Sequence, residues 1–331
     1  MSRQRRALQS TAAGPMRDFL DHHRALGKRF DNEAWALSLF DHYLVEQKVE
    51  ALTAITPLLV DDFLSARPRK VAKSYNHLLG VLRRWFNWLV AQERLDQSPL
   101  HLEPRRLTGF RPPFLFAPDQ ARRLLAITAE LPDNPQAHQR GLVYSTIFAL
   151  CYGLGLRVSE AARLRLKDID WDRCILILHE TKFAKSRLVP FGPKLAAKLK
   201  DYVQQREAHV GGLAPDQPLF CFDRDKGRSV SSHTVSRTFH EVWPKLGLNV
   251  PSGVAAPRLH CLRHSFAVGT LLRWYREGIE PKDRLLHLST FMGHAQPSST
   301  AVYLTITADL LQEANQRFER FASPLLKGGV S

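Results

Sequence analysis

The chain has 331 residues, 44% of them hydrophobic and 24% charged, which is typical of folded domains and enough for two of them. Its 47 lysines and arginines outnumber 32 aspartates and glutamates, giving a formal net charge of +15. This excess favours a polyanionic partner such as nucleic acid over a small neutral substrate. A membrane surface is disfavoured, because the sequence has neither a basic amphipathic helix nor a lipidation signal.

The sequence predicts a cytoplasmic protein. No stretch approaches the length of a transmembrane helix, and no apolar signal core follows the basic first six residues. The cysteines are too far apart for metal-ligand spacing or a disulfide framework, so we expect reduced thiols at Cys151, Cys174, Cys221 and Cys261.

The first hundred residues are predicted to be helical. Apolar spacing indicates helices over 16–30, 32–47 and 72–93, and Thr56-Pro57 is typical of the cap and first position of another that runs to about residue 66. Basic residues flank the apolar stripe of the last helix, and such a helix can lie along a phosphate backbone. An ordinary solvated face is the alternative. The candidate DNA-contacting residues here are Arg69, Lys73, Arg83 and Arg84.

A linker is predicted over 99–116, where prolines and charged residues are concentrated. It separates a helical domain over 1–98 from a second domain over 117–331. In the second domain we expect helices at about 118–130, 137–153 and 157–165, then a hairpin of 174–181 and 187–191, then mainly helices apart from a loop at about 247–258. The expected fold is mainly α, with a small antiparallel β-sheet in the second domain.

Two arginines, two histidines and a late tyrosine occur in an order that suits attack on a phosphodiester. Cutting a DNA strand without a metal needs a nucleophile, donors for the charge that grows on the phosphate, and a proton for the departing oxygen. Arginine suits the second task because its planar fork donates two hydrogen bonds to phosphate oxygens. The candidates are Arg157, His260, Arg263, His294 and Tyr303.

The spacing of these residues predicts which of them share a helix face or a turn. Glu160 lies one helical turn after Arg157 and could orient it, the alternative being an ordinary salt bridge. His260 and Arg263 are expected to share a helix face, whereas His264 is expected to point elsewhere and to be structural. Gly293 permits a tight turn before His294.

The tyrosine is expected on a separate element. Pro297 interrupts the chain after His294, and Ser298 or Ser299 can cap a new helix that carries Tyr303. Tyr275 is the rival nucleophile, but it precedes the Gly-His motif and lies in an expected amphipathic helix.

A lysine at the hairpin turn could supply the proton. Lys182 lies 25 residues after Arg157, and a lysine on this turn could reach the DNA and protonate the leaving 5′ oxygen. Lys185 competes for this role, and a solvated turn lysine is the plain alternative.

These motifs resemble those of the tyrosine recombinase (integrase) family. The matching pieces are Leu-Gly-Leu-Arg-Val-Ser-Glu, Leu-Arg-His-Ser-Phe-Ala and Met-Gly-His, followed by the tyrosine. The match covers about residues 117–310, and the helical domain is similar to the family's core-binding domain in order and size. The resemblance implies a site-specific recombinase of a mobile element that cuts and rejoins double-stranded DNA through a 3′-phosphotyrosine link, with no metal, ATP or other cofactor.

The resemblance also implies a role for each residue. Tyr303 would be the nucleophile, Lys182 the general acid and Glu160 a supporting residue. Lys185 would compete with Lys182 for the role of general acid, or would contact the DNA. The phosphate would be held by Arg157, His260, Arg263 and His294.

The implied assembly is a homotetramer on paired recombination sites, or one shared with other recombinases of the same element. A C-terminal helix over 307–321 would dock on a neighbouring subunit or pack within its own.

Two features depart from the Xer-type pattern. The lysine turn reads Thr-Lys-Phe-Ala-Lys where many relatives have Gly-Lys-Gly, and segment 274–290 is long, which looks more like transposon-borne integrases. Two other functions stay open: a catalytically silent DNA-binding relative that partners another recombinase, and a type IB topoisomerase, which shares the chemistry.

Overall fold

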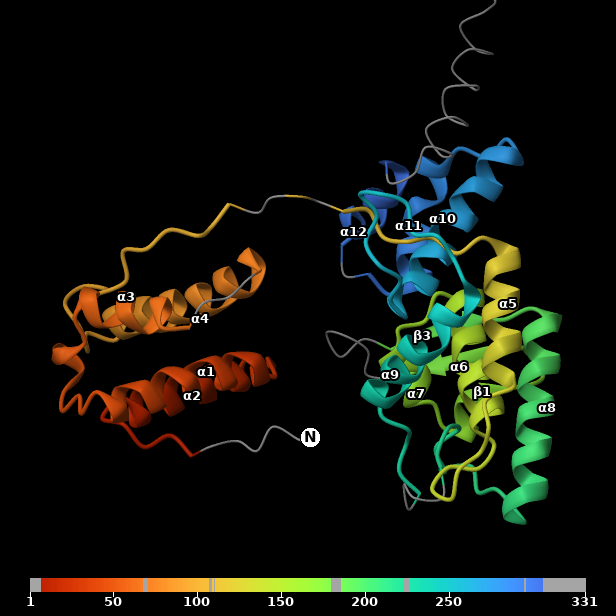
Figure 1. Ribbon diagram of the computed structural model, residues 1–331, viewed down its shortest axis with the longest axis horizontal. Helices are drawn as coiled ribbons and strands as arrows, with labels where there is room; N and C mark the ends of the chain where they lie inside the picture. The colour runs from red at the N-terminus through yellow and green to blue at the C-terminus, as the bar shows by residue number, and fades with distance from the viewer. Residues whose placement is uncertain are drawn as a thin grey trace, which may run out of the picture. The chain divides into compact units, whose positions relative to one another are not determined.

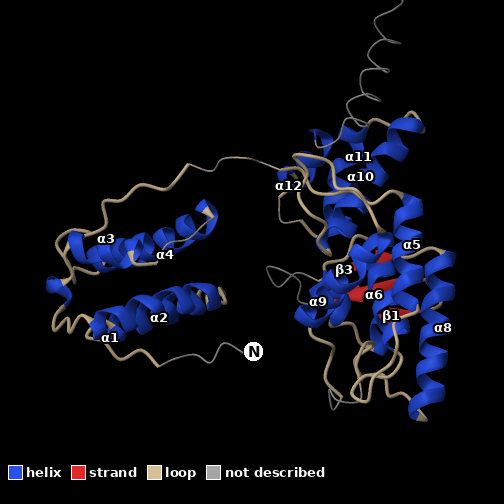
Figure 2. Ribbon diagram, in the orientation of Figure 1, coloured by secondary structure: helices blue, strands red, loops and turns tan. Residues whose placement is uncertain are grey.

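The computed structural model describes residues 7–67, 71–106, 109, 111–179, 186–222, 227–294 and 296–305. The chain divides into two compact units, Met1–Phe110 and Arg111–Ser331, and this boundary lies inside the segment 99–116. Helices dominate both units, and the strands form one small antiparallel sheet in the second (Figures 1 and 2). The predicted fold class is therefore confirmed. No helix in these described ranges is long and apolar enough to cross a membrane.

Four α-helices build the first unit: α1 (Ala13–Ala25), α2 (Asp31–Glu46), α3 (Pro57–Ser65) and α4 (Ala72–Ala91). A short 3-10 turn, η1 (Leu52–Ala54), precedes α3. The Thr56 side chain accepts a hydrogen bond from the Leu59 N–H, so the predicted cap is confirmed. The first helix ends five residues earlier than predicted, because Gly27 takes a left-handed conformation with φ 78°.

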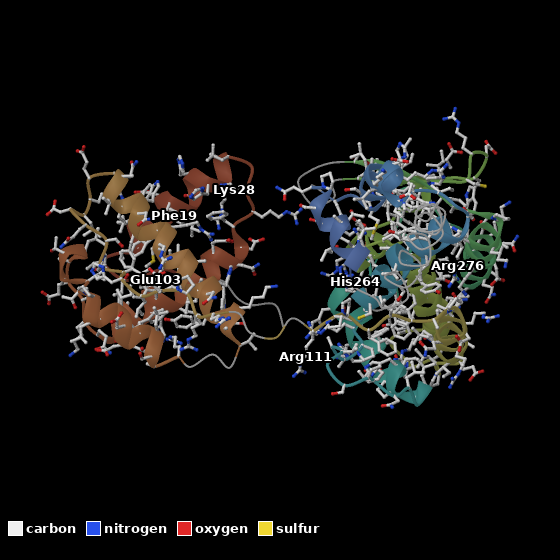
Figure 3. All side chains as sticks on the ribbon, turned by 90° about the horizontal axis from the view of Figure 1, so that it is seen from above. Phe19, Lys28, Glu103, Arg111, His264 and Arg276 are labelled. Atoms are coloured by element: carbon white, nitrogen blue, oxygen red, sulfur yellow. The ribbon has the colours of Figure 1, made fainter. Side chains whose placement is uncertain are left out.

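The core of this unit is aromatic. Phe40, Phe63, Trp85 and Phe86 are fully buried and meet edge to face or tilted, with ring centroids 4.8 to 6.0 Å apart. Phe19 of α1 is buried in the same cluster (Figure 3). The apolar stripe predicted on α4 is this buried face, which leaves its basic flanks at the surface.

A buried helix, α6 (Arg140–Gly153), is the centre of the second unit. Every residue from Val143 to Cys151 is buried, so the helix is covered on all sides. It packs against α5 (Pro118–Ala129), α8 (Pro193–Val210) and α10 (His260–Arg276) (Figure 1). Gly141 allows α5 and α6 to approach closely, because a Cβ there would overlap the Ala129 backbone.

The sheet has the order β1 (Ile169–Asp170), β2 (Ile175–Leu178), β3 (Arg187–Pro190), and all its strands are antiparallel. The predicted hairpin is β2–β3, with Leu178 opposite Arg187. The two-residue β1 was not predicted, because it is too short to show an alternating pattern. The helix predicted over 157–165 is shorter, α7 (Val158–Ala162), and a 3-10 turn, η2 (Leu166–Asp168), leads from it into the sheet.

The remaining described elements are α9 (Ser232–Val242), η4 (Trp243–Leu246), α11 (Pro281–Met292), α12 (Ser298–Ala301) and η5 (Val302–Thr305). Apolar residues of α10 and α11 form a separate small core that includes Tyr303. The capping prediction for Ser298 and Ser299 was wrong. Pro297 already has helical dihedrals, so Ser298 is the first residue of α12 and makes no side-chain cap. Tyr303 lies in η5, and the predicted helix 307–321 is outside the described residues.

Candidate active site

Three arginines converge on the C-terminal end of α11. Arg187 Nε donates to the Phe291 carbonyl oxygen at 2.8 Å, Arg263 Nη2 to Met292 O at 2.7 Å, and Arg157 Nη2 to Gly293 O at 2.8 Å. Carbonyls at a helix end have no partner within the helix and carry partial negative charge. Three consecutive carbonyls therefore fix three guanidinium groups that come from α7, β3 and α10.

The turn that follows α11 requires glycine. Gly293 has φ 68°, and a Cβ there would lie 2.6 Å from Nη1 of Arg187. The backbone N–H groups of Gly293 and His294 bond back to the carbonyls of Thr290 and Ser289, which is the Schellman pattern. His294 is thereby directed toward the arginines, and its Nδ1 lies 2.6 Å from the Thr300 hydroxyl oxygen.

The carboxylate of Glu160 joins two of these arginines. Oε1 lies 2.6 Å from Arg157 Nη1, and both oxygens accept from the Arg187 fork at 3.0 and 2.9 Å. Oε2 also accepts the Arg157 backbone N–H. Burial alone would raise the pKa of Glu160, but the bonds and charge of Arg187, together with Arg157, lower it to about 2. The carboxylate is therefore charged at neutral pH.

Arg263 is the most buried of the three arginines, at 1% exposure. It donates to Gly155 O as well as to Met292 O, and this ties the turn before α7 to α11. Burial and the neighbouring Arg157 lower the pKa of Arg263 to about 10, so it stays charged. Its Nε–H is buried without a hydrogen-bond partner in the described part of the chain.

The histidines of the site are neutral at pH 7. Burial and nearby Arg263 lower the pKa of His260 and of His294 to about 4, although the His260 ring still opens to solvent. Burial, His260 and Arg263 do the same for His264. A neutral ring can accept a hydrogen bond without adding charge to the arginine cluster.

Tyr303 is buried beside these rings, at 3% exposure. Its hydroxyl lies 2.8 Å from Nδ1 of His264, which is on α10 (Figure 3), and its ring is stacked with that of His294 at a centroid distance of 6.4 Å. Burial raises the pKa of Tyr303, while Arg263 and Arg157 oppose that rise. The hydroxyl is therefore protonated and shares a hydrogen bond with the neutral ring of His264.

The structure thus brings together Arg157, Glu160, His260, Arg263, His294 and Tyr303. The expectation that His264 points elsewhere was wrong. Positions four apart on a helix lie on the same side, and the rings of His260 and His264 are 4.6 Å apart.

Arg187 was missed as a site residue. Strand alternation could have indicated it, because Arg187 lies on the same face of β3 as the buried Val189. A charged residue at an inward position of a strand needs a buried partner, and here the partner is Glu160.

Several other candidates lie away from this cluster or outside the described residues. Lys182, Lys185 and Arg69 lie outside them. In the first unit, Arg83 donates to the Leu102 carbonyl at 2.5 Å and Arg84 pairs with Glu33 at 3.2 Å, while Lys73 is exposed.

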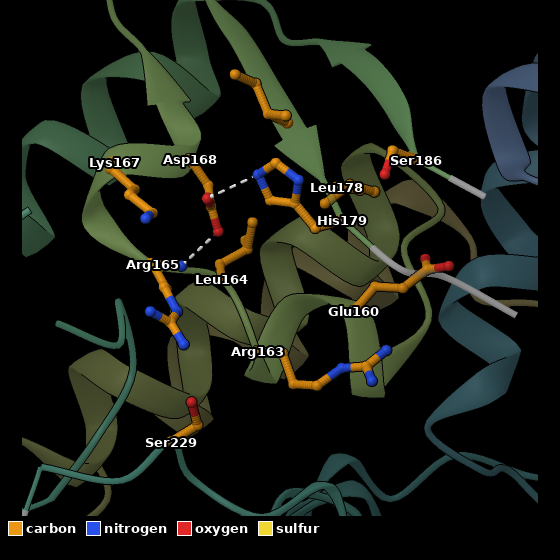
Figure 4. A pocket seen from close by; sticks show the side chains of 11 residues that line it. Glu160, Arg163, Leu164, Arg165, Lys167, Asp168, Leu178, His179, Ser186 and Ser229 are labelled. Atoms are coloured by element: carbon orange, nitrogen blue, oxygen red, sulfur yellow. Dashed lines mark hydrogen bonds and ion pairs between the residues drawn. The ribbon is translucent and has the colours of Figure 1, made fainter. Parts of the chain in front are cut away.

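A basic hollow of about 750 Å³ adjoins the cluster and has Glu160 in its wall (Figure 4). Arg165 and Lys167 line it and pair with Asp216 at 3.7 and 2.5 Å. His179 lies 3.2 Å from the buried Asp168 (Figure 4). The further basic lining comes from Arg163. Among the described lining residues, three cationic side chains stand against the carboxylates of Glu160 and Asp168, which favours an anionic occupant.

Residues 115–309 match the model of the Phage integrase family. The chain is 32% identical to the Sinorhizobium fredii protein y4rB, named as an integrase/recombinase, over 94% of this chain and 98% of that protein. It is 27% identical to the tyrosine recombinase XerA of Thermococcus kodakarensis, over 74% and 75% of the two chains.

Solved structures share the fold. The Tn1549 transposon integrase in complex with a circular intermediate DNA aligns with a TM-score of 0.66 and 16% identity, over 93% of this chain and 100% of that one. The XerH recombinase bound to a difH substrate aligns with a TM-score of 0.61 and 19% identity, over 86% and 78%.

Proposed function

The chain belongs to the phage integrase family, whose tyrosine recombinases cleave and rejoin DNA, and we propose that it does so through a 3′-phosphotyrosine intermediate formed by Tyr303. The observation that carries this proposal is that Arg157 and Arg263 meet at one helix end, with Tyr303 near enough for both arginines to oppose the rise that burial causes in the pKa of its hydroxyl. In the described part of the chain, these guanidinium groups outnumber the one carboxylate that pairs with them. The cluster therefore keeps a net positive charge, which a phosphodiester would balance.

In the proposed step, the Tyr303 hydroxyl gives its proton to solvent, its oxygen attacks phosphorus, and the bond from phosphorus to the 5′ oxygen breaks. Arg157 and Arg263 donate to the non-bridging oxygens as their charge grows. His260 and His294 add neutral donors. Lys182 protonates the departing 5′ oxygen, and the 5′-hydroxyl of a partner strand later reverses the attack.

Tyr303 must leave its buried position to reach a phosphate. Its hydroxyl is bonded to His264, and it lies in the short element η5. A single turn of 3-10 helix can be displaced without unfolding the core of the unit. We propose that DNA binding moves this segment and frees the hydroxyl.

The biological role that we propose is recombination for a mobile element. The similarity to y4rB over nearly the whole of both chains and the fold shared with a transposon integrase support this role. Exchange between two duplexes requires four strand cuts, and each adduct consumes one tyrosine. A tetramer on paired sites therefore fits the chemistry.

The test is a nicked-substrate assay. Overlapping nicked duplexes that tile the genomic DNA on both sides of the coding sequence are incubated in EDTA with the wild type, Tyr303→Phe and Tyr275→Phe. The products are run on denaturing gels. Covalent adducts with the wild type and Tyr275→Phe, but not with Tyr303→Phe, are expected. Tyr275→Phe is the matched control, because Tyr275 was the rival nucleophile.

Two other results would count against this assignment. Loss of the adduct in Tyr275→Phe alone would move the nucleophile to α10. A specific shift on native gels without any adduct would favour the catalytically silent DNA-binding alternative.

A further inference from the structure

We propose that Arg187 is a positioning residue for DNA strand cleavage, an inference that rests on the function proposed above. It acts by holding Glu160 and the turn before His294, so that the Arg157 fork remains available to the phosphate. Three segments meet at this one side chain: the start of α7, the start of β3 and the end of α11.

The Arg187 side chain points into the protein and bonds to protein groups. Only 9% of the side chain is exposed. It donates two hydrogen bonds to the Glu160 carboxylate and one to the Phe291 carbonyl oxygen. Its two Nη atoms face the two oxygens of Glu160, while Nε faces the Phe291 carbonyl. A guanidinium held in this way acts through its neighbours, not by touching the DNA.

The first consequence concerns Arg157. Glu160 has two oxygens, and Arg157 Nη1 is already 2.6 Å from one of them. Without Arg187, a charged and buried carboxylate would lack most of its compensation and would draw Arg157 into a bidentate pair. That pairing would compete both with the bond from Arg157 to Gly293 O and with the incoming phosphate.

The second consequence concerns His294. Gly293 packs directly on the Arg187 guanidinium, and Arg187 Nε fixes the carbonyl of Phe291, near the end of α11. Removing the side chain would leave a gap beneath the turn and loosen the direction of His294. Arg187 therefore couples two parts of the proposed phosphate clamp.

The experiment measures single-turnover cleavage at saturating protein separately from DNA affinity. It uses the nicked duplex that gives an adduct with the wild type, and compares Arg187→Gln with Arg173→Gln. Arg173 is the matched control, because it lies in the same sheet region but its side chain is 79% exposed. We expect Arg187→Gln to cleave about 100-fold more slowly, as displaced catalytic groups do. DNA affinity should stay at the wild-type value, and the control should match the wild type in both.

A double-mutant cycle that combines Glu160→Gln with Arg187→Gln decides between a positioning role and a purely structural one. If Arg187 acts by neutralising and orienting Glu160, the double variant Glu160→Gln/Arg187→Gln should cleave no more slowly than Arg187→Gln alone, and partial rescue is expected. A residue needed only for folding would show no such rescue. Arg187→Lys keeps the charge but loses the fork, so it should fall between the wild type and Arg187→Gln.

The proposal is overturned if Arg187→Gln cleaves at the wild-type rate, or if the losses in the two single variants multiply in the double variant. It is also overturned if affinity falls as much as the rate, because Arg187 would then be a DNA contact. Should Arg187→Gln fail to melt cooperatively, the same cycle is run with Arg187→Lys and judged in the same way. Failure of the proposed function is seen separately, because the wild type itself would then give no Tyr303-dependent adduct.

Discussion

The Nδ1 atom of His264 lies 2.8 Å from the hydroxyl oxygen of Tyr303, whose ring belongs to the small core between α10 and α11. Burial lowers the pKa of the histidine and raises that of the tyrosine, so the two form a hydrogen bond between neutral groups. The bond satisfies a hydroxyl that is otherwise enclosed, and it keeps the proposed nucleophile in place while DNA is absent.

Replacing His264 by leucine should expose Tyr303. A buried hydroxyl without an acceptor costs about 1–3 kcal/mol, so the closed arrangement should open about tenfold more often. We expect faster nitration of Tyr303 by tetranitromethane, measured by peptide mapping of the native protein. Tyr202 is the internal control, because it is fully buried and donates to Leu219 O, far from His264 in the sequence. Equal nitration of Tyr303 in the wild type and the variant would mean that His264 does not hold it.

Gly293→Ala should destabilise the second unit more than Gly278→Ala. Both glycines have a positive φ, 68° and 80°, so both variants carry a similar backbone strain of about 1–2 kcal/mol. Only at Gly293 does the new methyl group meet Arg187, whose guanidinium is fixed by three hydrogen bonds and cannot easily move away.

Denaturant unfolding of the two variants measures this difference. We expect Gly293→Ala to cost about 1–3 kcal/mol more than Gly278→Ala, the usual range for overpacking. A lower cleavage rate should accompany it, because His294 follows directly. Equal unfolding free energies would show that the Arg187 side chain yields to the methyl group.

The stability of the protein should fall as the pH is lowered from about 7 to about 4. The pKa of each of His260, His264 and His294 is about 4 in the folded state, against 6.5 as the ordinary value. Between these values the unfolded chain binds more protons than the folded one, so the free energy of unfolding decreases as the pH falls. Glu160, with a pKa of about 2, loses its contribution only at more acidic pH.

Thermal melting of the wild type and His264→Leu isolates part of this effect. The variant lacks one of the three groups, so its melting temperature should fall less between about pH 7 and about pH 5. Identical or steeper falls in the variant would contradict the assignment of a neutral, buried His264.

Much of the fold could be predicted from the sequence, because helices with long apolar stripes and a clear cap at Thr56 are local features. The misses have local causes as well. Strand β1 is two residues long, and the end of α1 depends on Gly27. The predicted serine cap fails because Pro297 already has helical dihedrals before Ser298.

Several residues that meet at the site were predicted from the sequence, but the contacts that hold them were not. Motifs placed Arg157, Arg263 and His294 together, yet the shared element is a row of backbone carbonyls at the end of α11, and no side-chain pattern encodes it. Arg187 could have been found from strand alternation. His264 could have been found from helical spacing, because it lies four residues after His260.

Lys73 and Arg83 should contribute differently to DNA binding, although both were candidates on the same helix. Lys73 is exposed, whereas Arg83 donates to the Leu102 carbonyl and lies 3.8 Å from Glu103, so it fastens the chain that follows α4. Lys73→Ala should weaken binding to a mixed-sequence duplex and reduce the slope of log affinity against log salt concentration by about 0.9, the value for one phosphate contact. Arg83→Ala should lower the melting temperature and leave that slope nearly unchanged. Fluorescence anisotropy across a salt series, together with thermal melting of both variants, separates the two roles. A slope change in Arg83→Ala as large as that in Lys73→Ala would assign Arg83 to the DNA despite its bond to Leu102.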